Sequence, residues 1–455
     1  MPSPVEFADV HRARFESELN DLLRIPSIST LPEHRDDTRR AAHWLAEYLR
    51  AMDLPVVELI ETAGYPLVYA EWMGAPGRPT LLGYGHYDVQ PVDPVDLWTS
   101  PPFQPAVRGG RLFARGATDD KGQVLTLIGA ARAYLQTAGR LPINIKLLIE
   151  GEEESGGAGI EAYVREHADR LGADACLVLD SGMFAPGIPA ITLGLRGIVG
   201  AEIEVTGPAR DLHSGSYGGV APNPFQALAE ILTGLKDKDG RILIPGFYDR
   251  VVPPPAEEKS GWERLPFDEA AFLRNEVGSP ALTGEPGYSA LERMWSRPTL
   301  EIHGMPGGFT GAGSKTVIPS RASAKISMRL VAAQRPDEIS GLFASHVRAI
   351  APKGVRVNVQ TRHGAPPVVI SPQSPAIAAA KRALTEAFGR ETVFIRTGGS
   401  VPIVSEFAGR LGLPVVVTGW ALPDANAHSP DESLDLEHFH KGIRAVMNFF
   451  EHLAG

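Results

Sequence analysis

The sequence predicts an α/β protein in which a mostly parallel sheet, flanked by helices, is interrupted by an inserted α+β domain. Apolar runs at residues 79–85, 143–149 and 175–179 are separated by loops and helical patterns, as in parallel sheets covered on both faces. Residues 198–207 and 322–331 instead alternate apolar and polar side chains, which is typical of half-buried antiparallel strands.

Helical patterns and one further strand complete this organisation. In the outer parts of the chain we expect helices at 123–135, 160–167, 376–387 and 436–453, and a strand at 413–419. In the insert we expect helices at 224–235 and 336–350 and a strand at 355–363. These elements predict one domain from residues 1–193 and 367–455, interrupted by an inserted α+β domain at 194–366.

Two segments carry more local expectations. Phe15, Leu19, Leu22 and Leu23 recur on one side of an amphipathic helix near the N-terminus. Residues 239–298 are rich in proline and glycine, and we expect a long irregular excursion there.

Composition narrows the class of function. A length of 455 residues favours two domains, and 43% hydrophobic with 22% charged residues is typical of soluble globular proteins. The formal net charge of −10, without a long Lys/Arg run, disfavours a nucleic-acid partner. No apolar run approaches the roughly 20 residues that span a bilayer, so no membrane partner is expected. The first residues lack the features of a signal peptide, and Cys176 is the single cysteine, so we expect a cytoplasmic protein.

Acidic and histidine residues follow the predicted strands at several separate places. His86 and Asp88 follow one strand, the glutamates within 150–154 follow the next, Asp180 follows a third, and His428 comes after residues 413–419. One such residue is usually a turn or capping residue, and an acidic run is usually a solvated surface. Because the carboxyl ends of parallel strands meet at one edge of the sheet, four such places together indicate a site.

Asp119 and Asp120 lie just before a helix that begins near Gly122. Helix capping explains one of these aspartates, but not both. A site with two metal ions needs a carboxylate that bridges them, and Asp119 is the candidate. Imidazole and carboxylate ligands suit Zn²⁺ or Mn²⁺, and a further carboxylate without a metal is available as a general base.

Six motifs give the chain a family resemblance. They are "HYDVQP", "RGATDDKGQ", "EGEEESGG", "LDSG", "DLHSGSYGG" and "NAHSPDES". In this order they resemble the di-metal exopeptidase clan of carnosinases, aminoacylases and carboxypeptidase G. The "DLHSGSYGG" motif and the long insert are most similar to the cytosolic nonspecific dipeptidase, or carnosinase-like, branch.

The resemblance implies a role for each residue of the predicted site. His86 and Asp180 would bind one metal ion, Glu154 and His428 the other, and Asp119 both. Asp88 would orient the imidazole of His86, and the peptide bond after Asp119 is expected to be cis. Glu153 would be the general base that takes a proton from a water held between the two ions.

The run of glutamates at 150–154 can be aligned with the family motif in more than one way. The commoner motif of this branch, "EGMEES", has an apolar residue where this sequence has Glu152. Alignment on "EES" makes Glu153 the base and Glu154 the ligand, and a slip of one residue is the alternative. An irregular turn, permitted by Ser155, Gly156 and Gly157, is needed to point the two side chains apart.

The insert and the C-terminal part carry the residues expected to contact substrate. The resemblance implies that His213 reaches the active site of a partner subunit and stabilises the oxyanion, which implies a homodimer. The insert at 194–366 would then be a lid and dimerisation domain. It also implies that Arg329 binds the free carboxylate of the substrate. His363, Gly399 and Ser400 match further substrate-contacting positions.

The expected function is hydrolysis of dipeptides by an exopeptidase that holds two divalent ions, Zn or Mn. The main alternative is an amidohydrolase of N-acyl amino acids, of aminoacylase or desuccinylase type, which would use the same metal centre. A non-catalytic metal-binding protein and a two-metal phosphoesterase are further alternatives. The intact ligand set disfavours the former and the motif order the latter.

Overall fold

The computed structural model describes residues 2–362, 364–399 and 401–455. The chain divides into two compact units. Unit 1 comprises Met1–Leu193, Ile370–Ile395 and Val401–Gly455, and unit 2 comprises Gly194–Val369 and Arg396–Ser400.

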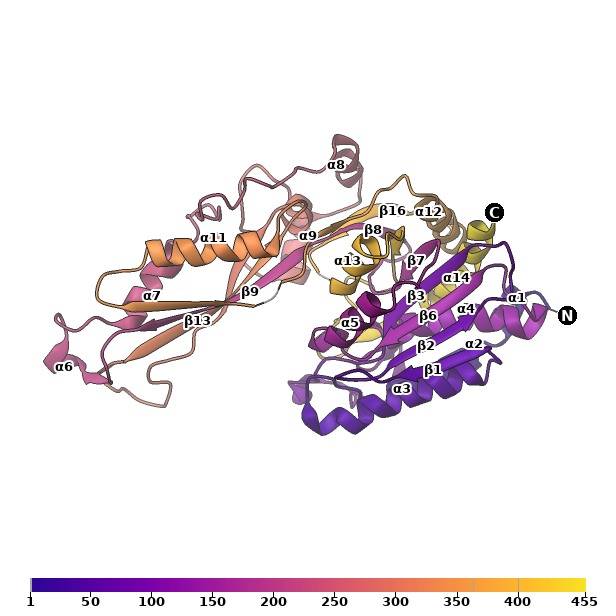
Figure 1. Ribbon diagram of the computed structural model, residues 1–455, viewed down its shortest axis with the longest axis horizontal. Helices are drawn as coiled ribbons and strands as arrows, with labels where there is room; N and C mark the ends of the chain where they lie inside the picture. Colours follow the sequence, from indigo (N-terminus) through magenta and orange to yellow (C-terminus); the bar gives the residue numbers. More distant parts are fainter. Residues whose placement is uncertain (1, 363, 400) are drawn as a thin grey trace. The chain divides into compact units, whose positions relative to one another are not determined.

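Unit 1 is built around a six-stranded sheet in the order β1-β2-β6-β3-β7-β17 (Figure 1). Its strands are β1 (Val56–Ile60), β2 (Leu67–Trp72), β3 (Thr80–His86), β6 (Asn144–Glu150), β7 (Ala175–Val178) and β17 (Val415–Val417). The four strands from β6 to β17 are mutually parallel, whereas β1 and β2 form an antiparallel edge. This mixed, mostly parallel sheet confirms the fold class predicted from the apolar runs.

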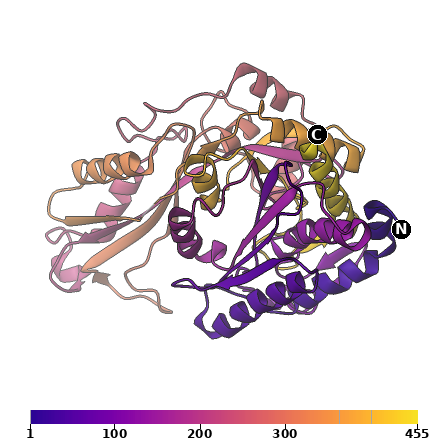
Figure 2. The ribbon, with the colours of Figure 1, turned by 45° about the vertical axis from the view of Figure 1, so that its right-hand side comes forward.

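Helices cover both faces of this sheet (Figures 1 and 2). They are α1 (Pro4–Val10), α2 (Arg12–Leu23), α3 (Arg35–Arg50), α4 (Lys121–Ala138), α5 (Ala158–Glu166), α12 (Pro375–Phe388), α13 (Pro402–Gly409) and α14 (Leu436–Ala454). Alternate residues of β3 face opposite layers: a Cβ at Gly83 would meet Leu127 of α4, whereas the Tyr84 ring lies edge-on to Phe407 of α13. The absence of a side chain at Gly83 therefore lets α4 lie close to the sheet.

Short elements complete unit 1 or lie where the chain passes from one unit to the other. They are η1 (Pro32–His34), η2 (Val95–Leu97), η3 (Glu153–Ser155), β4 (Ala106–Arg108), β5 (Arg111–Phe113), β8 (Ala190–Leu195), β15 (Val368–Val369), β16 (Val393–Thr397) and β18 (Ser433–Asp435). Two three-stranded sheets have the orders β18-β5-β4 and β15-β8-β16. Within the described part of the chain, no helix has the length and apolarity needed to cross a membrane.

The N-terminal segment differs from the single helix expected. It forms two helices that meet at His11, whose φ of −103° interrupts the helical backbone. The His11 ring stacks on Phe7, and its Nδ1 lies 2.8 Å from the Phe7 carbonyl oxygen. The predicted apolar face is nevertheless correct, because Phe15, Leu19 and Leu22 are buried.

Unit 2 contains a four-stranded antiparallel sheet in the order β11-β13-β9-β14. Its main elements are β9 (Gly197–Thr206), β11 (Thr299–Gly304), β13 (Arg321–Leu330), β14 (Arg356–Thr361), α7 (Pro224–Thr233) and α11 (Pro336–Ala349). Burial alternates along β9 and β13, and the buried residues pack with Leu228 and Phe343 of the two helices. A short pair, β10 (Leu212–His213) and β12 (Val317–Ile318), lies beside α6 (Ser214–Tyr217).

Residues 239–298 are more ordered than the proline and glycine content predicts. They contain α8 (Ala256–Glu263), α9 (Glu269–Phe272), the π-helical turn η4 (Leu273–Val277) and α10 (Ala290–Trp295). Helix α8 is anchored through Glu258, whose two carboxylate oxygens accept hydrogen bonds from Arg396 at 2.7 and 2.6 Å. Trp262 and Trp295 add an edge-on aromatic contact, so side chains distant in sequence organise this segment.

Candidate metal centre

The polar residues that follow the strands of unit 1 converge, as expected for the carboxyl ends of parallel strands. His86 is the last residue of β3, and Asp180 lies two residues beyond β7. Glu154 lies in η3, directly after β6, and His428 lies in the loop between β17 and β18. Asp119 immediately precedes Asp120, the N-cap residue of α4.

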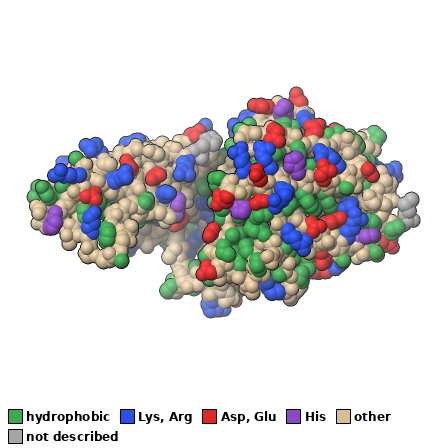
Figure 3. All heavy atoms as spheres, turned by 90° about the horizontal axis from the view of Figure 1, so that it is seen from below, with side chains coloured by type: hydrophobic (Ala, Val, Ile, Leu, Met, Phe, Trp, Pro, Cys, Tyr) green, Lys and Arg blue, Asp and Glu red, His purple; other side chains and the backbone are tan. Residues whose placement is uncertain are grey.

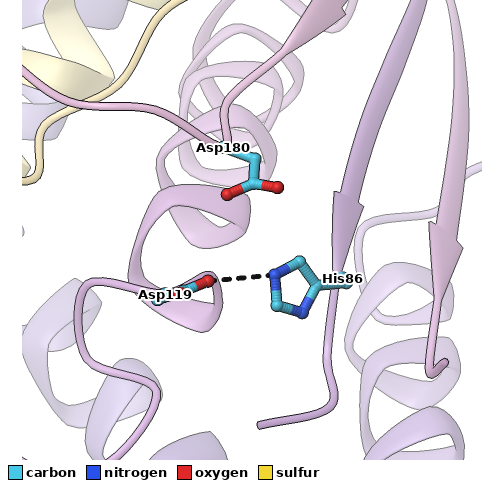
Figure 4. Close-up of side chains that lie close together, drawn as sticks. All are labelled: His86, Asp119 and Asp180. Carbon is cyan, nitrogen blue, oxygen red and sulfur yellow. Dashed lines mark hydrogen bonds and ion pairs between the residues drawn. The ribbon is translucent and has the colours of Figure 1, made fainter. Parts of the chain in front are cut away.

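Two groups of potential metal ligands share Asp119. In the first, ligand atoms of His86, Asp119 and Asp180 all lie within 4.8 Å of one another (Figure 4). Nε2 of His86 lies 3.1 Å from Oδ1 of Asp119, and the His86 side chain is fully buried.

The second group contains Asp119, Glu154 and His428, again with ligand atoms within 4.8 Å of one another. Nε2 of His428 lies 3.0 Å from Oδ2 of Asp119 and 3.1 Å from Oε1 of Glu154. The two oxygens of Asp119 therefore face different histidines, which is the arrangement a bridging carboxylate needs.

The protonation behaviour of these groups shows that the site attracts positive charge. Burial raises the pKa of Asp180 to about 7, and the nearby Asp119 adds to this effect. Hydrogen bonds to Asp119 and Glu154 raise the pKa of His428 to about 10. Burial opposes ionisation of Asp119, but the two imidazoles hold its pKa below the usual range.

These residues fit two divalent cations. Each group supplies a nitrogen and carboxylate oxygens, the donors that Zn²⁺ and Mn²⁺ accept. Oε1 of Glu154 is buried, the Glu154 side chain is only 4% exposed, and this oxygen faces Nε2 of His428 at 3.1 Å. A buried carboxylate oxygen of this kind is costly unless a donor or cation meets it.

Asp88 contacts two of the candidate ligand residues, His86 and Glu154. Nδ1 of His86 lies 3.3 Å from Oδ1 of Asp88 and 3.0 Å from its carbonyl oxygen, so Nε2 is the nitrogen presented to the site. Oδ2 of Asp88 accepts hydrogen bonds from the Ser29 hydroxyl at 2.6 Å and from the Glu154 backbone N–H at 3.1 Å. Carboxylates placed behind ligating histidines in this way fix the imidazole orientation.

The glutamate run separates into side chains that face different surroundings. Glu152 points to Gly64 and Gly159, and its carboxylate lies 3.5 Å from the Thr62 hydroxyl. Glu154 instead belongs to the second ligand group. The expected irregular turn is present as the 3₁₀ helix η3.

The general-base candidate, Glu153, lies beside the ligands. Burial raises its pKa well above the usual range, and the charges of Asp180 and Glu154 act in the same direction. Gly156 and Gly157, with φ of 116° and 61°, follow η3 in backbone conformations that favour glycine. This turn is what allows consecutive glutamates to have different surroundings.

The Asp119–Asp120 peptide bond is cis, which confirms the expectation. Asp120 occupies the N-cap position of α4 but makes no side-chain capping bond there. Its Oδ2 instead accepts the backbone N–H of His86 at 3.1 Å. Simple helix capping therefore does not account for this aspartate pair.

Comparison with known proteins identifies the relationship. The sequence profile of peptidase family M20/M25/M40 matches residues 82–452. The chain belongs to this family. Its membership confirms the resemblance inferred from the six motifs.

Similar M20-family proteins include dipeptidases. The chain is 32% identical to human Beta-Ala-His dipeptidase over 99% of its own length and 92% of that protein. It is 33% identical to the Cys-Gly metallodipeptidase dug1 of Schizosaccharomyces pombe over 86% of its length and 83% of that protein. The solved structure of the dipeptidase Dug1p from Saccharomyces cerevisiae superposes with a TM-score of 0.88 at 28% identity, covering 99% of this chain and 98% of that one.

Of the other predicted site residues, His213, Arg329 and Gly399 belong to unit 2. His213 is exposed, and its Nδ1 accepts the Gly215 N–H at 3.1 Å, so the proton of the neutral ring is on Nε2. Arg329 is partly buried in β13, and burial lowers the pKa of its guanidinium. Gly399 is exposed, with its N–H donated to the Thr397 hydroxyl at 3.2 Å. His363 and Ser400 lie outside the described residues.

Sequence reasoning missed two polar residues that support the ligands. Nε2 of Gln90 donates to Oε2 of Glu154 at 2.7 Å. Glu432 is fully buried and accepts the backbone N–H of Asp119 at 3.1 Å. Gln90 lies in the motif "HYDVQP" and Glu432 in "NAHSPDES". Their presence in motifs that carry the family resemblance was the sequence feature that could have identified them.

Proposed function

We propose that this protein is a metal-dependent dipeptidase. The observation that carries the proposal is the pair of ligand groups that share Asp119, with Glu153 beside them. Family membership and the similarity to two dipeptidases over most of the chain support the same activity.

The proposed ligand sets follow from the two groups. His86, Asp119 and Asp180 would hold one divalent cation, and Asp119, Glu154 and His428 the other. Two such cations, Zn²⁺ or Mn²⁺, polarise the scissile carbonyl and lower the pKa of water when they are bound. Asp88 keeps Nε2 of His86 directed to this site through its contact with Nδ1.

Glu153 would move the proton. It takes a proton from the attacking water and returns it to the nitrogen of the leaving amine, so that the peptide bond breaks with a neutral leaving group. Because burial raises the pKa of Glu153, its carboxylate holds a proton more readily than an exposed glutamate does. This suits a group that must both accept and release a proton within one turnover.

Unit 2 would supply substrate recognition. The guanidinium of Arg329 and the backbone of Gly399 and Ser400 would bind the free carboxylate of the dipeptide, and His363 would contact the substrate. His213 has the tautomer that donates from Nε2, which suits a group that stabilises an oxyanion. In the homodimer that we propose, His213 of one subunit serves the active site of the other. A cytoplasmic location completes the proposal.

A hydrolysis screen with metal analysis tests this function. The protein is stripped with a chelator, reloaded with Zn²⁺ or Mn²⁺, and assayed on dipeptides and N-acyl amino acids that share a C-terminal residue, such as β-alanyl-histidine and N-acetylhistidine. We expect two ions per subunit and a higher kcat/KM for dipeptides, with activity lost in the bridging-ligand variant Asp119→Ala. Preference for the N-acyl substrates would instead identify an amidohydrolase, and fewer than two ions in fully active protein would refute the two-ion arrangement.

A further inference from the structure

Glu432 is a buried carboxylate that the proposed reaction does not use. It lies four residues after His428, directly before β18, and is 0% exposed. Its backbone carbonyl accepts the Ala114 N–H at 3.1 Å, which continues the pairing between β18 and β5. The side chain therefore points from the His428 loop to the segment that leads into Asp119.

Both oxygens of Glu432 are filled by N–H donors of that segment. Oε2 accepts Nη1 of Arg115 at 2.7 Å and the backbone N–H of Gly116 at 3.0 Å. Oε1 accepts the backbone N–H groups of Thr118 at 2.9 Å and Asp119 at 3.1 Å. Four donors leave no open acceptor position directed to a cation, so Glu432 acts on the site only through the backbone that it binds.

The Gln123 side chain also connects the segment before Asp119 to the loop that contains His428. The Gln123 side chain donates to the Thr118 carbonyl at 2.9 Å and accepts the Trp420 N–H at 2.8 Å. Glu432 and Gln123 thus hold the Thr118–Asp119 backbone to both ends of the loop that contains His428. That loop includes His428 itself at φ 60°, a left-handed conformation that surrounding contacts must maintain.

We propose that Glu432 is a positioning residue that fixes the Asp119 backbone so that its two carboxylate oxygens face His86 and His428 together. This inference rests on the proposed function, since it assigns Glu432 to the assembly of that site. A bridging ligand must satisfy both cations at once, so a small rotation of Asp119 weakens both sites. Loss of Glu432 should therefore lower metal affinity, and kcat at limiting metal, while leaving KM nearly unchanged.

The alternative is that Glu432 only neutralises Arg115. Arg115 is 1% exposed and also donates to the Pro91 carbonyl at 3.0 Å, so the pair contributes to folding in either case. The two roles use different oxygens, because Arg115 binds Oε2 whereas the Thr118 and Asp119 N–H groups bind Oε1. Arg115→Gln is therefore a matched control that disturbs the ion pair and leaves the Oε1 bonds in place.

Calorimetric titration of the metal-free full chain with Mn²⁺ separates these roles, with thermal unfolding of the same metal-free samples. We expect Glu432→Gln to weaken Mn²⁺ binding by about 10–100-fold, the range for groups that orient metal ligands. Arg115→Gln should lower the melting temperature but keep the Mn²⁺ affinity close to wild type. If Glu432→Gln does not fold, the double variant Glu432→Gln/Arg115→Gln, which leaves no unpaired buried charge, is titrated in its place.

Wild-type Mn²⁺ affinity in Glu432→Gln, or an equal loss in Arg115→Gln, would overturn this inference while leaving the proposed function intact. A wild-type chain that binds fewer than two Mn²⁺ ions would contradict the proposed function, and the inference with it.

Discussion

The adjacent residues Glu152 and Glu153 offer a direct test of the proton-transfer role. Glu153→Gln keeps the size of the side chain and removes its ability to accept a proton. Glu152→Gln makes the same chemical change one residue away, where the carboxylate faces Thr62, Gly64 and Gly159. Any difference in activity between the two variants therefore reports where the carboxylate lies, because the chemical change is the same in both.

The expected magnitudes differ because the surroundings differ. Loss of a positioned general base typically costs about 10²–10⁴ in rate, which corresponds to roughly 3–5 kcal/mol in the barrier. For Glu152 the side-chain hydrogen bond from the Thr62 hydroxyl is long, at 3.5 Å, and its loss does not touch the ligand groups. Glu152→Gln should therefore retain a kcat close to wild type.

The assay measures kcat at saturating dipeptide, with the bound metal of each variant counted on the same samples. Glu153→Gln should be nearly inactive with two ions still bound, because Glu153 is not among the grouped ligand atoms. An active Glu153→Gln together with an inactive Glu152→Gln would refute the reasoning and shift the register of the motif by one residue. Loss of metal from Glu153→Gln would instead make Glu153 a ligand.

Three further substitutions test other contacts. Asp88→Asn should weaken metal binding by about 10–100-fold, measured by chelator competition, and unchanged affinity would contradict the orienting role. Tyr84→Phe removes the 2.7 Å hydrogen bond to the buried Glu150 and should cost about 1–3 kcal/mol in urea unfolding; a stability equal to wild type would show that Glu150 does not depend on this bond. Arg396→Gln breaks the two-fold contact with Glu258, whose side chain is 13% exposed, and should cost about 3–5 kcal/mol. Limited proteolysis measures this loss: the Arg396→Gln variant should be cleaved faster near α8 than wild type. A cleavage rate equal to that of wild type would mean that other contacts hold α8.

The sequence predicts the candidate ligands of unit 1 well because strand ends impose the geometry. His86, Asp180 and Glu154 each follow a buried strand, and parallel strands must bring such residues to one edge. The alternation of apolar and polar residues likewise predicts the antiparallel sheet of unit 2, since its period of two is visible locally. Local periodicity and strand order are therefore sufficient for this part of the molecule.

Contacts between segments far apart in the sequence were not predictable in this way. Glu432 binds a backbone segment more than 300 residues earlier, and the Arg396–Glu258 pair spans 138 residues. No periodicity marks such pairs. The break at His11 was missed because all four residues of the predicted apolar face lie after it, in α2, and so carry no information about the chain before it.

The buried carboxylates of unit 1 differ in the groups that contact their oxygens. The oxygens of Glu432 accept hydrogen bonds from four N–H groups. Oδ2 of Asp88 accepts from the Ser29 hydroxyl and the Glu154 N–H, while its buried Oδ1 makes no hydrogen bond within the described chain and faces Nδ1 of His86 at 3.3 Å. Asp119 and Glu154 instead face Nε2 of His428, at 3.0 and 3.1 Å, and the three residues form one group of possible metal ligands.

The surroundings of each carboxylate assign its role more sharply than residue type does, because oxygens whose lone pairs are taken by N–H donors, as in Glu432, are not available to a cation. Glu150, within the same glutamate run, is accommodated in a different way. One of its oxygens is taken by Tyr84, and burial raises its pKa to about 8, so its neutral form can occupy the end of β6 without a cation. A run of four glutamates thus supplies one proposed ligand, one proposed base and two side chains that support the fold.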